Sequence, residues 1–306
     1  MVNEGLMPWA PIVQRWTTLD ATLETECWIV RDDLLPFPLA GNKVRKIEAE
    51  LSAIPGDIDV LITNGGVDSN HCRTVAMFAA QRGLHTHLVL HGDDSDCNSI
   101  SIKMLETLGA TFDIGPANTI RERIEQAEQR HVAENQKVHI VSGGGHTAAG
   151  AQAFKDAGIS AFRTKNFDQV FVASGTGATQ GGLVAAAELS SPQTKVIGVS
   201  VARDKARGIP PVEEAAKWAG AQSPHITFLD EYRAGGYGKS DSQVEEAVQM
   251  GWRLGIPLDF TYTGKAFSAM VDLSRKNQLG EKVLFWHTGG LFNWVSLTQK
   301  LAVPNR

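Results

Sequence analysis

Residues 169–187 read QVFVASGTGATQGGLVAAA, in which an apolar run passes through a turn rich in glycine and threonine into an alanine-rich run. The first part has the composition of a β-strand and the last part that of an α-helix. Between them, Gly175 and Gly177 permit a tight turn that exposes backbone amides beside the threonine hydroxyls. Amides, hydroxyls and the amino end of a helix favour a phosphate group. A tight turn without a ligand is the alternative.

Two familiar nucleotide-binding motifs do not fit this stretch. The dinucleotide fingerprint fails because Gln180 stands where its third glycine belongs. The P-loop pattern fails because the stretch lacks the closing Gly-Lys-Ser/Thr. The segment therefore predicts a phosphate site and leaves the molecule that carries the phosphate open.

The same alternation of strand and helix extends along the chain. Further short apolar runs occupy 59–64, 87–90, 138–142, 195–201 and 282–287. Segments with helical composition and length lie between them, at 69–83, 99–110 and 181–190. Strands that alternate with crossover helices predict an α/β protein with parallel sheets.

Composition narrows the class of protein. The chain has 306 residues, of which 42% are hydrophobic and 21% charged, with a formal net charge of -5. This balance predicts a soluble globular protein with no nucleic-acid partner. The opening MVNEGLMPWAP lacks a basic leader, and no apolar window reaches membrane-spanning length, so we expect a cytoplasmic protein without a membrane partner. Cys27, Cys72 and Cys97 form no Cys-x-x-Cys pattern, so neither a disulfide framework nor a metal site is expected.

A cationic cluster lies at 41–46, which read GNKVRK. Lys43, Arg45 and Lys46 stand where a helix is expected to enter the core, and buried cations need partners. A pocket for an anion or an electrophile explains the cluster, while a solvated helix face is the simpler alternative.

The segment NGGVDSNHCR, residues 64–73, places two glycines at the end of a strand and Ser69 and Asn70 at the start of a helix. These two side chains, with the free amides of the helix end, are suited to bind a carboxylate or an oxygen on a ring. Taken alone, the pattern favours an ordinary N-cap role for Ser69.

The segment HTGG, residues 287–290, puts the Thr288 hydroxyl at the carboxyl end of another strand. In open parallel sheets, ligands bind at that edge. Four junctions between strand and helix thus supply a lysine, an anion cradle, hydroxyls and glycines. Their combination predicts a phosphorylated aldehyde held by the lysine.

At these residues the chain resembles the pyridoxal-phosphate enzymes of the tryptophan synthase β fold. Within that family it is similar to the D-cysteine desulfhydrase and 1-aminocyclopropane-1-carboxylate deaminase group. The resemblance covers most of the chain and rests on five motifs in order: LAGNKVRKIE, NGGVDSNHCR, SGTGATQGG, YTGK at 262–265 and HTGG. It implies pyridoxal 5'-phosphate as the cofactor.

The resemblance assigns roles to the cofactor-binding residues. Lys43 matches the lysine that forms the Schiff base, and Lys46 matches a phosphate contact. The phosphate loop corresponds to Gly175, Thr176, Gly177, Ala178 and Thr179.

The resemblance also assigns residues around the ring and the substrate. Asn70 matches the partner of the ring phenolate oxygen, and Thr288 a threonine beside the pyridine nitrogen. Ser69 and Tyr262 match catalytic residues, one near the substrate carboxylate and one over the substrate. Tyr237, in GGYGKSD, resembles a tyrosine near the ring, although a surface loop also accounts for so short a string.

The implied architecture is the tryptophan synthase β-like fold (fold type II), with two open parallel-sheet α/β domains. Residues 1–46 and 161–306 are expected to form the large cofactor-binding domain and 47–160 the small one, with the cofactor in the cleft between them. A homodimer is also implied by the resemblance.

The expected activity is that of a pyridoxal-phosphate-dependent lyase on a small amino acid. A D-cysteine desulfhydrase-like elimination, giving pyruvate, ammonia and sulfide, is favoured because Thr263 and Thr288 stand where the deaminase group calls for glutamate and an apolar residue. The alternatives are opening of the aminocyclopropane ring and a lyase for L-cysteate or another β-substituted alanine. A protein that binds the cofactor without turnover is the alternative of another class.

Overall fold

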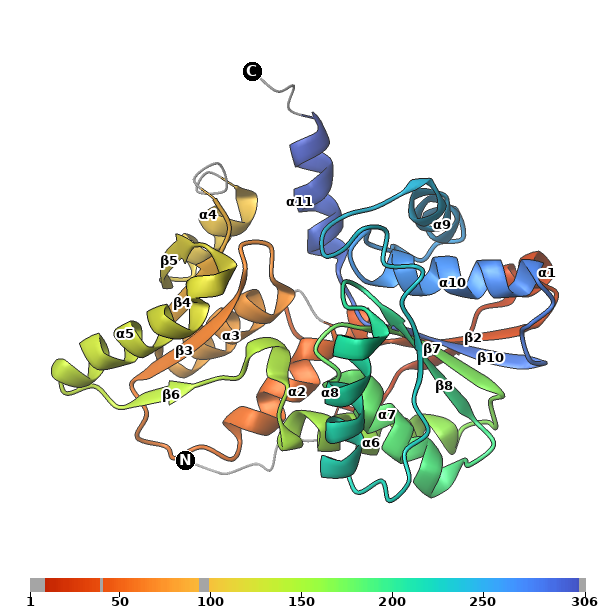
Figure 1. Cartoon of the computed structure of the whole chain (residues 1–306), viewed down its shortest axis with the longest axis horizontal. Helices are drawn as coiled ribbons and strands as arrows, with labels where there is room; N and C mark the ends of the chain where they lie inside the picture. The colour runs from red at the N-terminus through yellow and green to blue at the C-terminus, as the bar shows by residue number, and fades with distance from the viewer. Residues whose placement is uncertain (1–8, 39–40, 94–98, 303–306) are drawn as a thin grey trace. The chain divides into compact units, whose positions relative to one another are not determined.

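A computed structural model describes residues 9–38, 41–93 and 99–302 (Figure 1). Over their described residues, contacts group Met1–Lys46 with His146–Trp294 as a first unit and Ile47–Gly145 with Val295–Arg306 as a second. The division implied by the resemblance differs at residues 146–160 and at the last helix. Residues 146–160 join the first unit because helix α6, Ala148–Phe162, packs along helix α7, Ala178–Ser190.

The first unit contains a six-stranded sheet with the order β1-β2-β10-β7-β8-β9. Only the edge strand β1 runs antiparallel to its neighbour, and the other pairings are parallel. The strands are β1 (Val13–Arg15), β2 (Glu26–Arg31), β7 (Gln169–Ser174), β8 (Lys195–Ser200), β9 (Thr227–Leu229) and β10 (Lys282–His287).

Helices cover both faces of this sheet. In Figure 1, α10 (Thr263–Arg275) lies on one face, while α6, α7 and α8 (Lys205–Trp218) lie on the other. The unit also contains α1 (Thr17–Leu23), α9 (Ser242–Arg253) and the 3-10 turn η1 (Asp32–Leu34). Helix α2, Asn42–Leu51, begins in this unit and continues into the second, as α11, Leu291–Ala302, also does.

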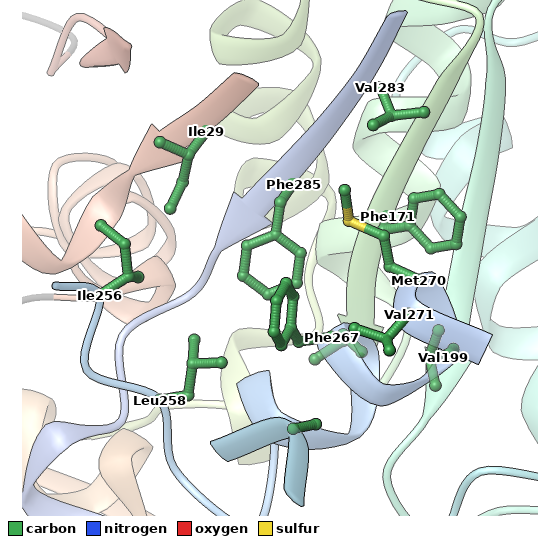
Figure 2. Close-up of a cluster of buried hydrophobic side chains, with 14 of the residues drawn as sticks. Ile29, Phe171, Val199, Ile256, Leu258, Phe267, Met270, Val271, Val283 and Phe285 are labelled. Atoms are coloured by element: carbon green, nitrogen blue, oxygen red, sulfur yellow. The ribbon is translucent and has the colours of Figure 1, made fainter. Parts of the chain in front are cut away.

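Two apolar clusters explain why these strands read as continuous hydrophobic runs. Phe171 and Phe285 point toward α10, where Phe267 and Met270 meet them (Figure 2). The alternate strand residues, including Trp286, join a second cluster with α6 and α7. A parallel sheet covered on both faces needs apolar side chains at odd and even positions alike.

The second unit contains a parallel four-stranded sheet with the order β5-β4-β3-β6. Two apolar clusters pack against this sheet as well. One includes residues of α3 (Asn70–Arg82) and α4 (Ile100–Thr107), and the other includes residues of α5 (Ile120–Ala133). The elements are β3 (Val60–Gly66), α3 (Asn70–Arg82), β4 (His85–His91), α4 (Ile100–Thr107), β5 (Thr111–Gly115), η3 (Ala117–Thr119), α5 (Ile120–Ala133), β6 (Val138–Ile140) and η4 (Gly143–Gly145).

The predicted α/β class with parallel sheets is confirmed, and all six predicted strands are present. The pattern did not single out β2, which lies between β1 and β10 and begins with Glu-Cys-Trp rather than with β-branched residues. The short strands β1, β5 and β9 were also not predicted. Cys97 lies outside the described residues.

Candidate functional site

The start of helix α2 is fixed at the carboxyl edge of the six-stranded sheet. The Asn42 amide donates to the Thr288 carbonyl at 3.1 Å, and Gly41 forms a β-bridge with Gly289. A Cβ atom on Gly41 would lie 2.7 Å from the Thr288 oxygen, so this approach requires glycine. Asn42 Nδ2 also donates to Thr179 Oγ1 at 3.0 Å. The first turn of α2 is thereby joined to the loops that follow β7 and β10.

The three cations of this turn are buried and have different surroundings. Arg45 donates twice to Asp32 Oδ1, at 3.0 and 2.7 Å, and Asp32 Oδ2 accepts from the Trp286 indole at 2.9 Å. Arg45 is therefore a structural residue within the core. Lys43 and Lys46, only 9% and 1% exposed, line a pocket instead. A solvated helix face does not describe this cluster.

The loop after β7 has the backbone geometry of an anion cradle. Gly177 has φ +107°, and a Cβ there would lie 2.9 Å from the Pro211 carbonyl carbon, so glycine is required on both counts. Within the described residues, no side chain caps the start of α7 at this position. The first amides of a helix have no partners within the helix, and its dipole adds positive potential.

One pocket brings most of the predicted cofactor residues together. It is lined by Lys43 and Lys46, by the 174–177 loop with Thr179, and by Tyr262, and we call it the Lys43 pocket. All these residues belong to the first unit. Ala178, the first residue of α7, is buried directly behind the loop. Two ammonium groups, hydroxyls and a helix amino end are a donor set that fits a phosphate carrying an aldehyde-bearing ring.

Ser174, the last residue of β7, is a pocket residue that the sequence placed in the glycine-rich turn without assigning it a role. It is 3% exposed, and its hydroxyl has no hydrogen-bond partner among the described residues. A buried hydroxyl without a partner is costly, whereas a hydroxyl that meets a bound anion is satisfied. Ser174 thus supports the fit of a phosphate group to the Lys43 pocket.

Tyr262 is held by the carboxylate of Asp259 at the start of α10. Asp259 accepts from the amides of Thr261, Tyr262 and Thr263 at 2.8–3.0 Å. The Thr263 hydroxyl donates to the same carboxylate at 2.7 Å and accepts from the Asp259 amide at 2.9 Å. Thr263 is completely buried, so its hydroxyl supports the turn that presents Tyr262.

Tyr237 contacts Tyr262 directly, because the two phenolic oxygens lie 2.9 Å apart. Tyr237 is 39% exposed and stands in a loop, as its Gly-Tyr-Gly string allowed. Thr288 contributes its carbonyl to the anchoring of Asn42 and is 6% exposed, but it does not line the Lys43 pocket.

Ser69 and Asn70 belong to the second unit, at the start of α3. The Ser69 hydroxyl accepts from the Cys72 amide at 3.3 Å, so its N-cap role is present. Asn70 Oδ1 accepts from the Arg73 guanidinium, and His71 Nε2 lies 2.8 Å from the buried Thr63 hydroxyl. His71 is therefore a buried structural group. Ligand roles for Ser69 and Asn70 remain predictions.

The described part of the chain contains neither a cluster of metal ligands nor a membrane-spanning helix. Within residues 9–38, 41–93 and 99–302, no group of three or more His, Cys, Asp or Glu side chains is arranged to hold a metal ion. Over the same residues, no helix combines the length and apolar character needed to cross a bilayer.

Comparison with known proteins gives consistent similarities. The family model described as "Pyridoxal-phosphate dependent enzyme" matches residues 9–289. A Pyrococcus horikoshii protein named "Putative 1-aminocyclopropane-1-carboxylate deaminase" is 32% identical over 298 residues, which are 94% of this chain and 91% of that protein. The crystal structure of an ACC deaminase homologue matches with a TM-score of 0.86 and 31% identity, over 97% of this chain and 94% of the other. A threonine deaminase from Solanum lycopersicum shares the fold, with a TM-score of 0.72 at 15% identity over 97% of this chain and 90% of its own.

Proposed function

The chain belongs to the family of pyridoxal-phosphate dependent enzymes, and from that premise we propose that it eliminates the β-substituent of D-cysteine. The fold is that of fold type II, the cofactor is pyridoxal 5'-phosphate, and the enzyme is a lyase of the ACC deaminase and D-cysteine desulfhydrase family. The proposed products are pyruvate, ammonia and sulfide.

The residues of the Lys43 pocket divide the binding of the cofactor between them. The Lys43 amine would hold the aldehyde carbon, while Lys46, Thr179 and the amides at the start of α7 would hold the phosphate. This assignment is supported by the burial of both lysines and by their position in one pocket with the glycine loop. When bound, the cofactor withdraws electrons from the substrate α-carbon and so makes the α-hydrogen acidic.

Lys43 would have a second task beside the substrate α-carbon. Its free amine would accept the α-proton, which is the role of a general base. The β-sulfur then leaves with the electron pair of its bond to carbon. Water hydrolyses the released aminoacrylate to pyruvate and ammonia, which balances the reaction.

Other side chains orient the substrate and the ring in this proposal. Tyr262 presents its hydroxyl at the Lys43 pocket, with Tyr237 as its partner. Ser69 is assigned to the substrate carboxylate, Asn70 to the ring phenolate oxygen, and Thr288 to the pyridine nitrogen. A hydroxyl beside that nitrogen stabilises a carbanion less than a carboxylate does, which suits an elimination with a good leaving group.

The hydrogen bonds and burial of Thr263 are the observation on which we choose between elimination and ring opening. By the resemblance, ring-opening deaminases place glutamate at this position, where a carboxyl group can move a proton. In this chain both hydrogen-bonding capacities of the Thr263 hydroxyl are used by Asp259, and the side chain is completely buried. Thr263 is therefore unsuited to carry a proton to or from a substrate. This observation favours elimination over ring opening.

Two other substrate classes are the alternatives. The name of the Pyrococcus horikoshii relative favours 1-aminocyclopropane-1-carboxylate, at 32% identity. L-cysteate and other β-substituted alanines would use the same elimination chemistry with a different leaving group.

Product analysis of the purified holoenzyme tests the proposal. Pyruvate and 2-oxobutyrate are measured with D-cysteine, L-cysteine, L-cysteate, β-chloro-D-alanine and 1-aminocyclopropane-1-carboxylate, each at several concentrations. We expect the highest kcat/KM for D-cysteine, with sulfide released in equal amount to pyruvate. Formation of 2-oxobutyrate from the cyclopropane substrate as the preferred reaction would overturn the proposal.

A further inference from the structure

Lys265 is a buried lysine that the proposed mechanism does not use. It lies in the first turn of α10, three residues after Tyr262, and is 0% exposed. Its ammonium donates to the carbonyl oxygens of Val201 at 2.9 Å, Arg233 at 2.8 Å and Gly236 at 2.6 Å. An ammonium group has three N–H donors, so three carbonyl oxygens satisfy it completely.

These carbonyl oxygens come from two separate segments of the first unit. Val201 directly follows strand β8, whereas Arg233 and Gly236 belong to the loop that leads into Tyr237. Lys265 therefore ties this loop both to the end of the sheet and to the start of α10. One side chain joins the segment before Tyr237 to the helix that Tyr262 begins.

The loop held by Lys265 has an unfavourable backbone. Ala234 has φ +49°, followed by Gly235 at +82° and Gly236 at +131°. A left-handed alanine costs energy and persists where its surroundings hold it. Few bonds within the loop oppose its opening: Gly236 donates to the Arg233 carbonyl at 2.9 Å and Lys239 to the Gly236 carbonyl at 3.3 Å. The Lys265 ammonium supplies strong, charge-assisted bonds at both of these carbonyl groups.

From this geometry we propose that Lys265 is a positioning residue that sets the Tyr237–Tyr262 hydroxyl pair at the Lys43 pocket. It acts through the backbone of residues 233–236 and does not touch the substrate. The inference rests on the proposed function, in which Tyr262 faces the substrate. A lysine that served stability alone would leave the order of the Tyr237 loop unchanged after its removal from a folded protein.

The carboxylates that act on Lys265 do not explain its position. Asp259 and Asp241 both attract its charge, yet Asp259 is already bonded to the turn at 261–263. The three hydrogen bonds of the Lys265 ammonium all go to carbonyl groups. Lys265 is therefore placed to bind backbone oxygens and not a carboxylate.

The test replaces Lys265 with methionine, which keeps the length of the side chain and removes all donors. Lys276→Met is the matched control, because Lys276 follows the same helix but bonds Asp272 with more than half of its side chain exposed. Hydrogen exchange of residues 233–239 in the holoenzyme is the first readout, and it needs no substrate. We expect exchange at least about 10-fold faster in Lys265→Met and unchanged in Lys276→Met.

Steady-state kinetics is the second readout, with whichever substrate the enzyme turns over. Lys265→Met should bind pyridoxal phosphate within about 2-fold of wild type, because the Lys43 pocket keeps its own residues, and should lose about 10-fold in kcat/KM. Tyr237→Phe should then cost less in the Lys265→Met background than in wild type. Failure of the D-cysteine assay alone would count against the proposed function, while the exchange result would still decide the role of Lys265.

Wild-type exchange of 233–239 in folded Lys265→Met, or fully additive effects of the two substitutions, would overturn the proposal. Lys265→Gln covers the case in which the methionine variant does not fold. Glutamine retains two N–H donors for the carbonyl groups, so it should give intermediate exchange and intermediate kcat/KM. Wild-type values for a folded Lys265→Gln enzyme would also contradict the inference.

Discussion

The hydroxyl groups of Tyr237 and Tyr262 lie 2.9 Å apart, although the two residues are separated by 25 positions in the chain. Their rings meet edge to face, with centroids 5.8 Å apart and planes at 83°. This arrangement restricts the direction of the Tyr262 hydroxyl, which borders the same pocket as Lys43. Tyr237, in a loop, thus limits the orientation of Tyr262 at the start of α10.

Removal of either hydroxyl tests whether the tyrosines act as a pair. Tyr237→Phe keeps the ring contact and loses the hydrogen bond, so we expect kcat/KM to fall about 5- to 10-fold. Tyr262→Phe should cost more, because it also removes the group that faces the substrate. The double variant should resemble Tyr262→Phe, and strictly additive losses would show that the two residues are independent.

Ser174 is expected to contribute to cofactor affinity rather than to folding. Since its buried hydroxyl has no partner in the described part of the chain, Ser174→Ala should leave the thermal midpoint of the apoprotein unchanged or slightly higher. Loss of one hydrogen bond to the phosphate should raise the Kd for pyridoxal phosphate about 5- to 10-fold, measured by cofactor titration.

Ser200→Ala is the matched control for Ser174→Ala. Ser200 pairs with Ser174 across neighbouring strands and is equally buried, but its hydroxyl already donates to the Arg203 carbonyl at 2.6 Å. The control should therefore lower stability by about 1 kcal/mol and leave cofactor affinity unchanged. Equal cofactor affinity in all three proteins would refute the role of Ser174.

Lys43 is expected to be essential both for the visible absorption of the bound cofactor and for turnover of the substrate. Lys43→Ala should remove the visible absorption of the lysine-bound cofactor and lower kcat by about 10²- to 10⁴-fold or more, as expected for loss of a general base. Lys195→Ala, at an exposed position where β8 begins, should retain both properties. A Lys43→Ala enzyme with wild-type absorption would assign the cofactor to another lysine.

The buried pair of Arg45 and Asp32 is expected to support the fold. Both side chains are nearly inaccessible, so Arg45→Ala leaves a buried carboxylate without its cation and should cost about 3–5 kcal/mol of unfolding free energy. Arg275→Ala breaks an exposed pair with Glu246 and should cost less than about 1 kcal/mol. Denaturant unfolding compares the two, and similar losses would contradict the difference in burial.

Stability should depend on pH through Lys265. Burial lowers the pKa of Lys265 to about 8 from its usual 10.5, while Asp259 and Asp241 act in the opposite direction. Between pH 8 and 10.5 the unfolded chain therefore binds more protons at this lysine than the folded chain does, so its contribution to stability rises with pH. Relative to Lys265→Met, the slope of unfolding free energy with pH should be more positive by up to about 1.4 kcal/mol per pH unit. Parallel slopes would show that the lysine keeps an ordinary pKa.

Features that depend on a contiguous stretch were predicted from the sequence. The strand, glycine turn and helix of 169–187 form as expected, because a continuous apolar run and the freedom of glycine act within a few residues of each other. The pattern at 41–46 predicted a pocket for an anion or an electrophile, with a solvated helix face as the alternative, and the burial of all three cations excludes that alternative. Strand β2 was not predicted, because its place beside β10 depends on packing against residues that are distant in the chain.

Contacts between distant segments could not be predicted in the same way. Ser174 stood in the SGTGATQGG motif without an assigned role, and only its burial in the pocket reveals a hydroxyl that has no partner among the described residues. Lys265 was part of a recognised motif, yet its three carbonyl partners lie 29 to 64 positions away. Sequence spacing does not specify which backbone oxygens will face a buried ammonium.

The sequence by itself determined the α/β class and the glycine turn at 175–177, since both depend on local conformation and residue chemistry. The role of Lys43 as the reactive amine follows from the resemblance of its motif to a known family and stays a prediction. Tertiary structure alone decided that Lys265 binds the backbone of residues 233–236 and that the Thr263 hydroxyl is bonded to Asp259. It also decided that Tyr237 contacts Tyr262. The physical reason is that hydrogen bonds act over about 3 Å, so their partners are set by packing rather than by order along the chain.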